Sequence, residues 1–194
     1  MKKGVLIVMA RAPRFGAVKT RLARDIGRMK AWQFYRGTFT NTVRRLRTGP
    51  WKTGIQVTPD REATARRQWP LSGYLLKQGR GDIGTRMERG LTNFPRGIPV
   101  VLIGSDIPEV SVDHINKAFR ALGHADAVFG PANDGGYWLV GFANRRPIRQ
   151  PFQNVRWSTQ HALKDTRANL QGLRVTLVDE LCDVDDGESY ARQR

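Results

Sequence analysis

The stretch that decides the fold is GVLIVMARAPRFGAVKTRL, residues 4–22. Its first part, Val5–Ala10, is a short run of apolar and β-branched residues, which is typical of a strand buried on both faces of a parallel sheet. A turn that contains Pro13 and Gly16 follows directly, together with several basic residues. In an open α/β sheet the residues just beyond the carboxyl end of a strand line the ligand site. The stretch therefore predicts a central strand that leads into a binding turn.

The rest of the chain alternates short apolar runs with longer stretches of helical spacing, which favours an α/β fold with a mostly parallel sheet and helices on both faces. We expect strands at Val5–Ala10, Gly54–Thr58, Tyr74–Lys77, Val100–Gly104, Ala127–Gly130, Tyr137–Phe142 and Arg174–Val178. We expect helices at Ala31–Leu46, Glu62–Gln68, Thr85–Leu91, Val112–Leu122 and Thr159–Leu170, with Ser111 and Ser158 as the N-caps of the last two. The strand at Tyr137 follows its predecessor after too few residues for a parallel crossover, so an antiparallel or irregular pairing and a mixed sheet are predicted.

Length and charge limit the class of protein. At 194 residues the chain is long enough for one sizeable core, and no linker, repeat or low-complexity tract divides it, so we expect a single domain over residues 1–194. There are 33 Lys and Arg against 17 Asp and Glu, which gives a net charge of +16. Such a field attracts polyanions, and on charge alone nucleic acid, an anionic membrane surface and a phosphorylated small substrate all stay open.

Other features narrow these partners. No apolar run approaches the roughly 20 residues that a membrane helix needs. The basic residues are spread along the chain without a recognisable nucleic-acid module. The single cysteine, Cys182, cannot form a disulfide within the chain and has no neighbouring His, so we interpret it as a small buried apolar residue. A cytoplasmic location is expected.

The turn after the first strand carries Arg14, Lys19 and Arg21 around a predicted helix start. Converging backbone amides and positive side chains suit a phosphate group. The spacing is not that of a Walker A motif. A solvated basic loop is an equally good interpretation of this segment alone.

Acidic residues follow other predicted strands. Asp106 stands where a carboxylate can hold Mg²⁺ or Mn²⁺ beside nucleotide phosphates, although a turn Asp is common at such a place. Asp134 precedes Gly135 and Gly136, which permit positive φ and close backbone approach; the same residues are also good turn chemistry. Alternate carboxylates within residues 183–186 can reach one site, or can be ordinary surface charge or a helix cap.

Six stretches in this order match a family pattern. They are APRFGAVKTRL (12–22), GDIGTRM (81–87), GSDIP (104–108), GPANDGGYW (130–138), WST (157–159) and DVD (183–185). These motifs resemble the bacterial selenodomain-associated transferase family, a GT-A-like group similar to phospholactate and molybdenum-cofactor guanylyltransferases. The resemblance spans nearly the whole chain. It implies a Rossmann-like GT-A fold, the nucleotide-diphospho-sugar transferase fold, with a nucleotide across the strand ends and a divalent metal.

The resemblance also implies roles for individual residues. Lys19 and Asp106 would be catalytic, and Asp106 and Asp185 would hold Mg²⁺ or Mn²⁺. The residues that would bind the nucleotide are Arg11, Arg14, Gly16, Lys19, Arg21, Gly81, Asp82, Gly84, Arg86, Ser105, Asp134, Gly135 and Gly136. This chain reads Asp-Val-Asp-Asp-Gly-Glu-Ser over residues 183–189, where relatives carry an Asp-Val-Asp-Thr-Pro-Glu-Asp-like stretch. Arg11 stands where relatives usually have Lys, and Asn133 where an acidic residue is frequent.

The leading hypothesis is a metal-dependent transferase that uses a nucleoside triphosphate or a nucleotide sugar and transfers a nucleotidyl or glycosyl group to a small-molecule acceptor. We expect no specific nucleic-acid partner and no membrane span, and homodimer formation stays open. The alternative is a non-catalytic nucleotide- or RNA-binding protein on the same fold. The basic surface and the altered C-terminal motif favour that alternative.

Overall fold

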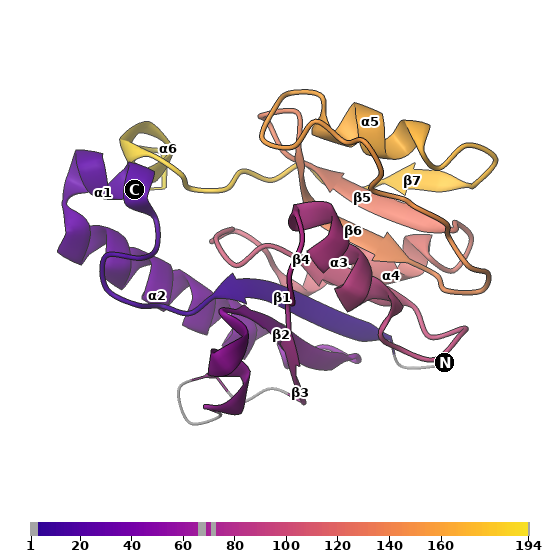
Figure 1. The fold of residues 1–194 in the computed structure, drawn as a ribbon, viewed down its shortest axis with the longest axis horizontal. Coiled ribbons are helices and arrows are strands. Elements are labelled where there is room, and N and C mark those ends of the chain that lie inside the picture. The colour runs from indigo at the N-terminus through magenta and orange to yellow at the C-terminus, as the bar shows by residue number, and fades with distance from the viewer. Residues whose placement is uncertain (1–3, 66–68, 71–72, 194) are drawn as a thin grey trace.

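The structure is a computed structural model that describes residues 4–65, 69–70 and 73–193. Within these residues seven strands form one sheet (Figure 1). In the order in which they lie across the sheet, the strands are β3 (Tyr74–Lys77), β2 (Lys52–Thr58), β1 (Val5–Arg11), β4 (Val100–Ile103), β6 (Tyr137–Phe142), β5 (Ala127–Pro131) and β7 (Val175–Leu177). β6 runs antiparallel to both of its neighbours, and the other neighbouring strands are parallel. The predicted α/β class, the mixed sheet and the antiparallel strand at Tyr137 are confirmed.

The register of β1 explains where a cleft opens. β1 pairs with β2 over its whole length, up to Arg11 opposite Thr58. β4 is shorter, and its last residue, Ile103, lies opposite Val8. The end of β1 therefore has no partner on the β4 side, and the chain after Ile103 turns away beside it. The strand order also changes direction here, because β2 and β3 lie on one side of β1 and β4 lies on the other. Such a switch point opens a crevice at the carboxyl ends of the strands.

Helices cover both faces of the sheet. In chain order they are α1 (Thr20–Ile26), α2 (Arg28–Leu46), α3 (Ile83–Thr92), α4 (Val112–Ala121), α5 (Ala162–Ala168) and α6 (Gly187–Ala191), with a 3₁₀ turn, η1, at Asp60–Thr64. Successive residues of a strand point to opposite faces. Leu6 and Val8 pack in one buried cluster with α2 and α4, whereas Val5 and Ile7 pack in another with α3 and α5. Both faces of β1 are therefore apolar, which is why its sequence reads as an uninterrupted apolar run.

Two short helices, α1 and α6, are absent from the predicted helix ranges. α1 and α6 have 7 and 5 residues, too few to show a periodic apolar pattern. Figure 1 shows them side by side at the end of the molecule away from β7, and the Gly187 amide donates to Asp25 Oδ2 at 2.7 Å. This contact brings the C-terminal segment back to the start of the chain.

Some predicted boundaries are wrong. α5 begins only at Ala162, and Ser158 has a φ of 60°, a left-handed conformation that is not that of an N-cap residue. The helix expected at Glu62–Gln68 is a 3₁₀ turn where the structure describes it, and residues 66–68 lie outside the described part of the chain. Cys182 is half-buried rather than buried, because it lies in the segment that crosses the strand ends.

The predicted N-cap of α4 is confirmed. Ser111 caps α4 as predicted, since its hydroxyl accepts a hydrogen bond from the His114 amide at 3.3 Å. Across the described residues, no helix is both long enough and apolar enough to span a bilayer.

α2 packs a buried stripe of residues into the core cluster on one face of the sheet. Its buried residues recur every three or four positions and are Ala31, Tyr35, Phe39, Thr42, Val43 and Leu46. The ring of Phe39 is 1% exposed. It lies edge-on to Trp69, with 5.8 Å between ring centroids, and stacks with Tyr35. Phe39 therefore joins α2 to the region beyond β2.

We expect Phe39→Ala to lower the free energy of unfolding by about 3–5 kcal/mol, because it removes a buried aromatic ring and leaves a cavity. Urea unfolding followed by circular dichroism measures the loss. Met29→Ala is the control: Met29 lies on the same helix but is 53% exposed, and its loss should stay below about 0.5 kcal/mol. If the two variants lose equally little, this face of α2 does not carry the core.

Candidate functional site

The turn between β1 and α1 brings Lys19 back to the end of the sheet. Gly16 and Lys19 have positive φ values, 73° and 47°. The Lys19 ammonium lies between two carboxylates, with Nζ 2.6 Å from Asp106 Oδ2 and 2.5 Å from Asp185 Oδ1. Only 6% of the side chain is exposed. A left-handed backbone is unfavourable for a residue that has a Cβ, and the two charge-assisted hydrogen bonds help to stabilise it here.

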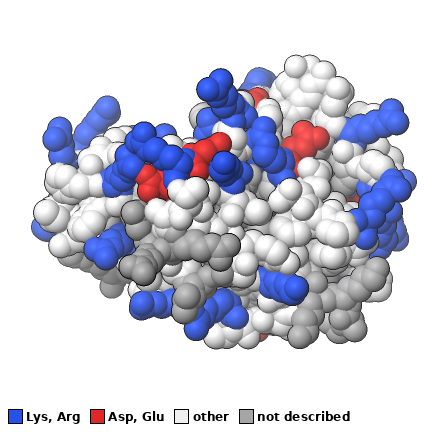
Figure 2. Space-filling view, turned by 60° about the horizontal axis from the view of Figure 1, so that its bottom comes forward, with Lys and Arg blue, Asp and Glu red and all other residues white. Residues whose placement is uncertain are grey.

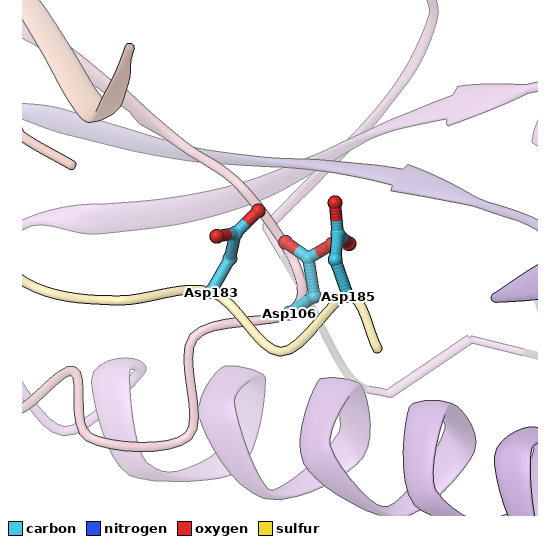
Figure 3. Close-up of side chains that lie close together, drawn as sticks. All are labelled: Asp106, Asp183 and Asp185. Carbon is cyan, nitrogen blue, oxygen red and sulfur yellow. The ribbon is translucent and has the colours of Figure 1, made fainter. Parts of the chain in front are cut away.

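Three carboxylates meet at this point (Figure 3). Asp106 lies in the turn after β4, whereas Asp183 and Asp185 lie in the segment between β7 and α6. One oxygen of each lies within 4.8 Å of the others. Between the two C-terminal aspartates, Val184 is fully buried against α1 and α2, and its amide donates to the Asp106 carbonyl at 3.3 Å. The buried valine anchors the segment, and the flanking side chains project to the same side as Asp106 (Figure 3).

The shared charges shift pKa values. Burial acts to lower the pKa of Lys19, but the charges and hydrogen bonds of Asp106 and Asp185 outweigh burial and raise it. Lys19 is therefore a permanent cation at neutral pH. Burial, followed by the charges of Asp185 and Asp106, raises the pKa of Asp183 to about 6.

Tyr35 of α2 connects this cluster to β1. Its hydroxyl accepts from the Arg11 amide at 3.0 Å, donates to the Arg11 carbonyl at 2.8 Å, and lies 3.2 Å from Ser105 Oγ. Burial is the main reason that the pKa of Tyr35 is raised. Tyr35 thus holds the unpaired end of β1 beside the turn after β4. In the sequence it is only one more residue of the buried stripe of α2.

Three neighbouring hollows share Asp106. The first, about 300 Å³, is enclosed by the turn after β1, and its lining includes Arg11, Lys19, Arg21 and Ser105. The second, about 290 Å³, lies over the ends of β1 and β4, beside α3. The third, about 440 Å³, lies among the turn after β4, the β5–β6 loop and the start of α5. Asp106 is therefore the meeting point of three spaces along the strand ends.

Most predicted residues of the first turn lie at the first hollow. Arg11, Lys19 and Arg21 line it. Gly16 forms the bend, with open space where a side chain would begin. Arg14 does not line any of the three hollows and instead forms an ion pair with Glu62, whose side chain is buried.

The predicted residues at 81–86 build the start of α3. Asp82 Oδ1 caps the helix by accepting from the Thr85 amide at 2.8 Å. Arg86 Nε donates to the Gly81 carbonyl at 2.9 Å. Gly84 has no room for a side chain, because a Cβ there would lie 2.7 Å from Trp157. The four predicted residues, Gly81, Asp82, Gly84 and Arg86, line none of the three hollows.

The residues of α3 that do face the cleft were missed. Ile83 and Met87 line both the second and the third hollow. Ile83 is 39% exposed, which is unusual for so large an apolar side chain at a helix start. In the sequence, the only sign that α3 faces the cleft is the apolar residue Ile83 directly after the capping Asp82.

The β5–β6 loop contributes to the third hollow. Asp134 and Gly136 line it, and Asp134 Oδ1 accepts from the Gly136 amide at 2.8 Å. Gly135, with a φ of 82°, packs against the chain itself: a Cβ there would lie 2.3 Å from the Gln160 carbonyl oxygen. The close approach that Gly135 permits is therefore made to residue 160.

The sheet order, the single reversed strand β6 and the switch-point cleft define an α/β protein with the nucleotide-diphospho-sugar transferase, or GT-A-like, fold. Residues 42–159 match the family described as "Uncharacterized protein conserved in bacteria (DUF2064)", and the chain belongs to this family. A comparison with curated proteins gave no match.

Solved structures share the fold over nearly the whole chain. A protein assigned as a nucleotide-diphospho-sugar transferase from Desulfovibrio desulfuricans G20 is 28% identical, with a TM-score of 0.79 over 96% of this chain and 84% of that one. CMP:2-keto-3-deoxy-manno-octonic acid synthetase, complexed with CTP, is 9% identical, with a TM-score of 0.61 over 98% and 96%. Rv0371c from Mycobacterium tuberculosis H37Rv, in complex with manganese, is 17% identical, with a TM-score of 0.56 over 99% and 98%.

We expect Lys19→Met to raise the affinity of the nucleotide-free protein for Mn²⁺ by about 10-fold or more, because the ammonium neutralises the carboxylates that a metal ion would use. Titration followed by electron paramagnetic resonance of unbound Mn²⁺ measures this affinity directly.

Arg21→Met is the matched control. It removes the same charge, but Arg21 is 67% exposed and lies 3.7 Å from Asp185 Oδ2, so solvent screens it and the change should stay within about 3-fold. Unchanged or weaker Mn²⁺ binding by Lys19→Met would show that lysine and metal do not use the same carboxylates.

We expect Asp183→Asn to raise the free energy of unfolding at pH 8, in EDTA, by about 1–2 kcal/mol. Solvent partly screens the half-buried Asp183 carboxylate, so the gain is smaller than the pKa shift alone would give. The folded pKa, about 6, lies above the ordinary value of 3.8. In wild type, the protonated Asp183 carboxyl therefore makes its full contribution to the free energy of unfolding below pH 3.8. This contribution is lost as the pH rises through about 6. Urea unfolding near pH 4 should give wild type and Asp183→Asn equal free energies of unfolding. A difference that does not change with pH would contradict this account.

Proposed function

We propose that this protein is a metal-dependent transferase that uses a nucleoside triphosphate or a nucleotide sugar and transfers a nucleotidyl or glycosyl group to a small-molecule acceptor. The observation that carries the proposal is the Lys19 ammonium held by Asp106 and Asp185 at the switch point of the sheet. The six motifs that resemble the selenodomain-associated transferases support the same activity, over one domain of residues 1–194.

The carboxylate cluster fits a hard divalent cation. Three carboxylate oxygens within 4.8 Å of one another offer the ligands that Mg²⁺ and Mn²⁺ prefer, and the ammonium already in contact with two of them stands in for a cation. We assign Asp106 and Asp185 as the main ligands and add Asp183, which was not among the predicted ligands. A metal bound there offsets the negative charge of the substrate phosphates. The manganese complex of Rv0371c supports this choice of ion.

The first hollow fits the phosphates. Arg11, Lys19 and Arg21 line it, so three positive side chains face one space. Lys19 lines this hollow and also contacts the carboxylates of Asp106 and Asp185. Its ammonium can therefore pair either with these carboxylates or with phosphates in the hollow. The CTP complex of the octonic acid synthetase supports a nucleotide on this fold.

Two versions of the reaction suit these residues. In nucleotidyl transfer, an acceptor phosphate oxygen bonds to the α-phosphorus and the bond to the departing diphosphate breaks. In glycosyl transfer, an acceptor oxygen bonds to the sugar carbon and a nucleoside diphosphate departs. Negative charge builds on the departing oxygen in both, and Lys19 and Arg11 stabilise it by charge and position. No side chain needs to form a covalent bond.

The third hollow fits the acceptor. It shares Asp106 with the phosphate side, and Asp134 and Asp183 offer carboxylate oxygens to it. Carboxylates accept hydrogen bonds, so they suit a small molecule that carries hydroxyl groups. The rings of Tyr137 and Trp157 supply its apolar walls.

The alternative, a non-catalytic nucleotide- or RNA-binding protein, rests on the net charge of +16. Figure 2 shows Lys and Arg side chains scattered over the face in view, with acidic groups among them. A polynucleotide-binding surface is expected to gather its basic residues along one track. The charge distribution on this face therefore favours the transferase.

We expect wild type to bind its nucleotide more tightly with Mg²⁺ or Mn²⁺ than in EDTA, and Asp106→Asn to remove this difference without unfolding the protein. Asn keeps the shape and one carbonyl oxygen but loses the negative charge that a hard cation needs. A thermal-shift screen of nucleoside triphosphates and nucleotide sugars measures it, since a ligand at 100 times its Kd stabilises by about 2.7 kcal/mol.

Asp113→Asn is the control, because Asp113 is exposed on α4, away from the cleft. It should keep the full metal dependence. Equal nucleotide binding by wild type in EDTA would contradict the metal mechanism. Binding to polynucleotide alone, with a steep loss of affinity in salt, would favour the alternative.

A further inference from the structure

Gln78 lies across the ends of the two central parallel strands. It follows β3 directly, and only 3% of the residue is exposed. Its backbone amide donates to the Val57 carbonyl at 3.0 Å. Its side-chain Nε2 donates to the Ala10 carbonyl at 3.1 Å and to the Gln56 carbonyl at 3.0 Å. The side chain is therefore locked to the carboxyl ends of β1 and β2.

These contacts decide which way the amide of Gln78 faces. Both neighbours are carbonyl oxygens, which only accept hydrogen bonds, so the group between them must be the NH₂. The other end of the amide, Oε1, has no donor among the residues that the structure describes, and it is not among the fully enclosed atoms that lack a partner. A buried glutamine thus keeps one acceptor unpaired and reachable.

The space beside Gln78 suits a flat ring. Gln78 lines the second hollow, whose volume of about 290 Å³ is at the lower end of the range of small-molecule sites. Apolar side chains, including Ile83, Met87 and Trp138, line the same hollow. Such walls favour an aromatic ring, and a small number of polar groups, here including Gln78, fix its orientation.

This hollow joins the one that we assign to phosphates. The two share Arg11, Ser105 and Asp106 in their linings. A ligand whose phosphates face Lys19 can therefore extend toward Gln78 with the rest of the molecule. For a nucleotide, the part that arrives there is the base.

We propose that Gln78 is a specificity-determining residue that accepts a hydrogen bond from an exocyclic amino group of the base, so that adenine, cytosine or guanine nucleotides bind in preference to uracil nucleotides. This inference rests on the proposed function, because it needs a nucleotide in the cleft. The carbonyls of Ala10 and Gln56 hold the NH₂ of Gln78 and so keep Oε1 as the end of the amide that is free to accept. Uracil has a carbonyl oxygen where cytosine has its amino group, and an acceptor such as Oε1 repels that oxygen, whereas an amino group offers only donors.

The first experiment needs no substitution. Calorimetric titration of wild type with ATP, CTP, GTP and UTP, in Mg²⁺, identifies the preferred base. The preferred nucleotide is then compared with its partner that lacks the amino group: ITP for GTP, UTP for CTP, or purine riboside triphosphate for ATP. We expect loss of the amino group to weaken binding at least about 10-fold, because it leaves a buried acceptor unpaired.

The second experiment locates the effect. Gln78→Met keeps the length of the side chain and removes the acceptor, so it should bind both members of the pair with equal affinity, while inorganic triphosphate binds as in wild type. Gln33→Met is the matched control, since Gln33 is exposed on α2, and it should keep the wild-type preference.

The outcomes separate the two proposals. If wild type binds nucleotides but does not distinguish the paired nucleotides, or prefers UTP, the role of Gln78 is overturned and the proposed function stands. If wild type distinguishes them and Gln78→Met does so equally, another residue reads the base. If neither nucleotides nor inorganic triphosphate bind in Mg²⁺, both proposals fail.

Discussion

The structure of the cleft depends on one ammonium group shared by two carboxylates. Lys19 Nζ contacts Asp106 and Asp185, which are 87 and 166 residues further along the chain. A buried ammonium without partners is costly, and so are neighbouring carboxylates without a cation. The turn after β1, the turn after β4 and the C-terminal segment therefore stabilise one another only when all three are in place. The residues that hold this end of the protein together are also those suited to phosphate and metal.

A backbone feature creates the space in which this interaction sits. β4 stops opposite Val8, whereas β1 continues to Arg11, so the end of β1 has no neighbouring strand on the β4 side. Tyr35 compensates by bonding both the amide and the carbonyl of Arg11, and Val184 anchors the C-terminal segment from the other side. Because buried contacts fix each of these segments, the charged groups have defined positions before any ligand arrives. Preorganised charge of this kind is what stabilises a developing negative charge efficiently.

The three hollows differ in the polar groups that they present. Lys19 and Arg21 line only the first, Gln78 lines only the second, and Asp134 and Asp183 line only the third. All three border Asp106, so a ligand group in any of them lies close to the proposed metal position. In the proposed function the first hollow takes the phosphates, the second the base and the third the acceptor. The chemistry of each space then follows from its lining rather than from the fold alone.

The sequence by itself determined the strands, because burial on both faces leaves a local apolar run, and it singled out Lys19 and Asp106, because charged residues directly after such runs stand out. Only the tertiary structure decided which of the other candidate residues face the cleft and which are used elsewhere. Arg14 pairs with Glu62, and residues 81–86 are used to start α3 while Ile83 and Met87 line the hollows. The reason is physical: periodicity reports which side of an element is buried, but a hydrogen bond or an ion pair depends on groups that approach from distant parts of the chain, and local sequence carries no record of that approach.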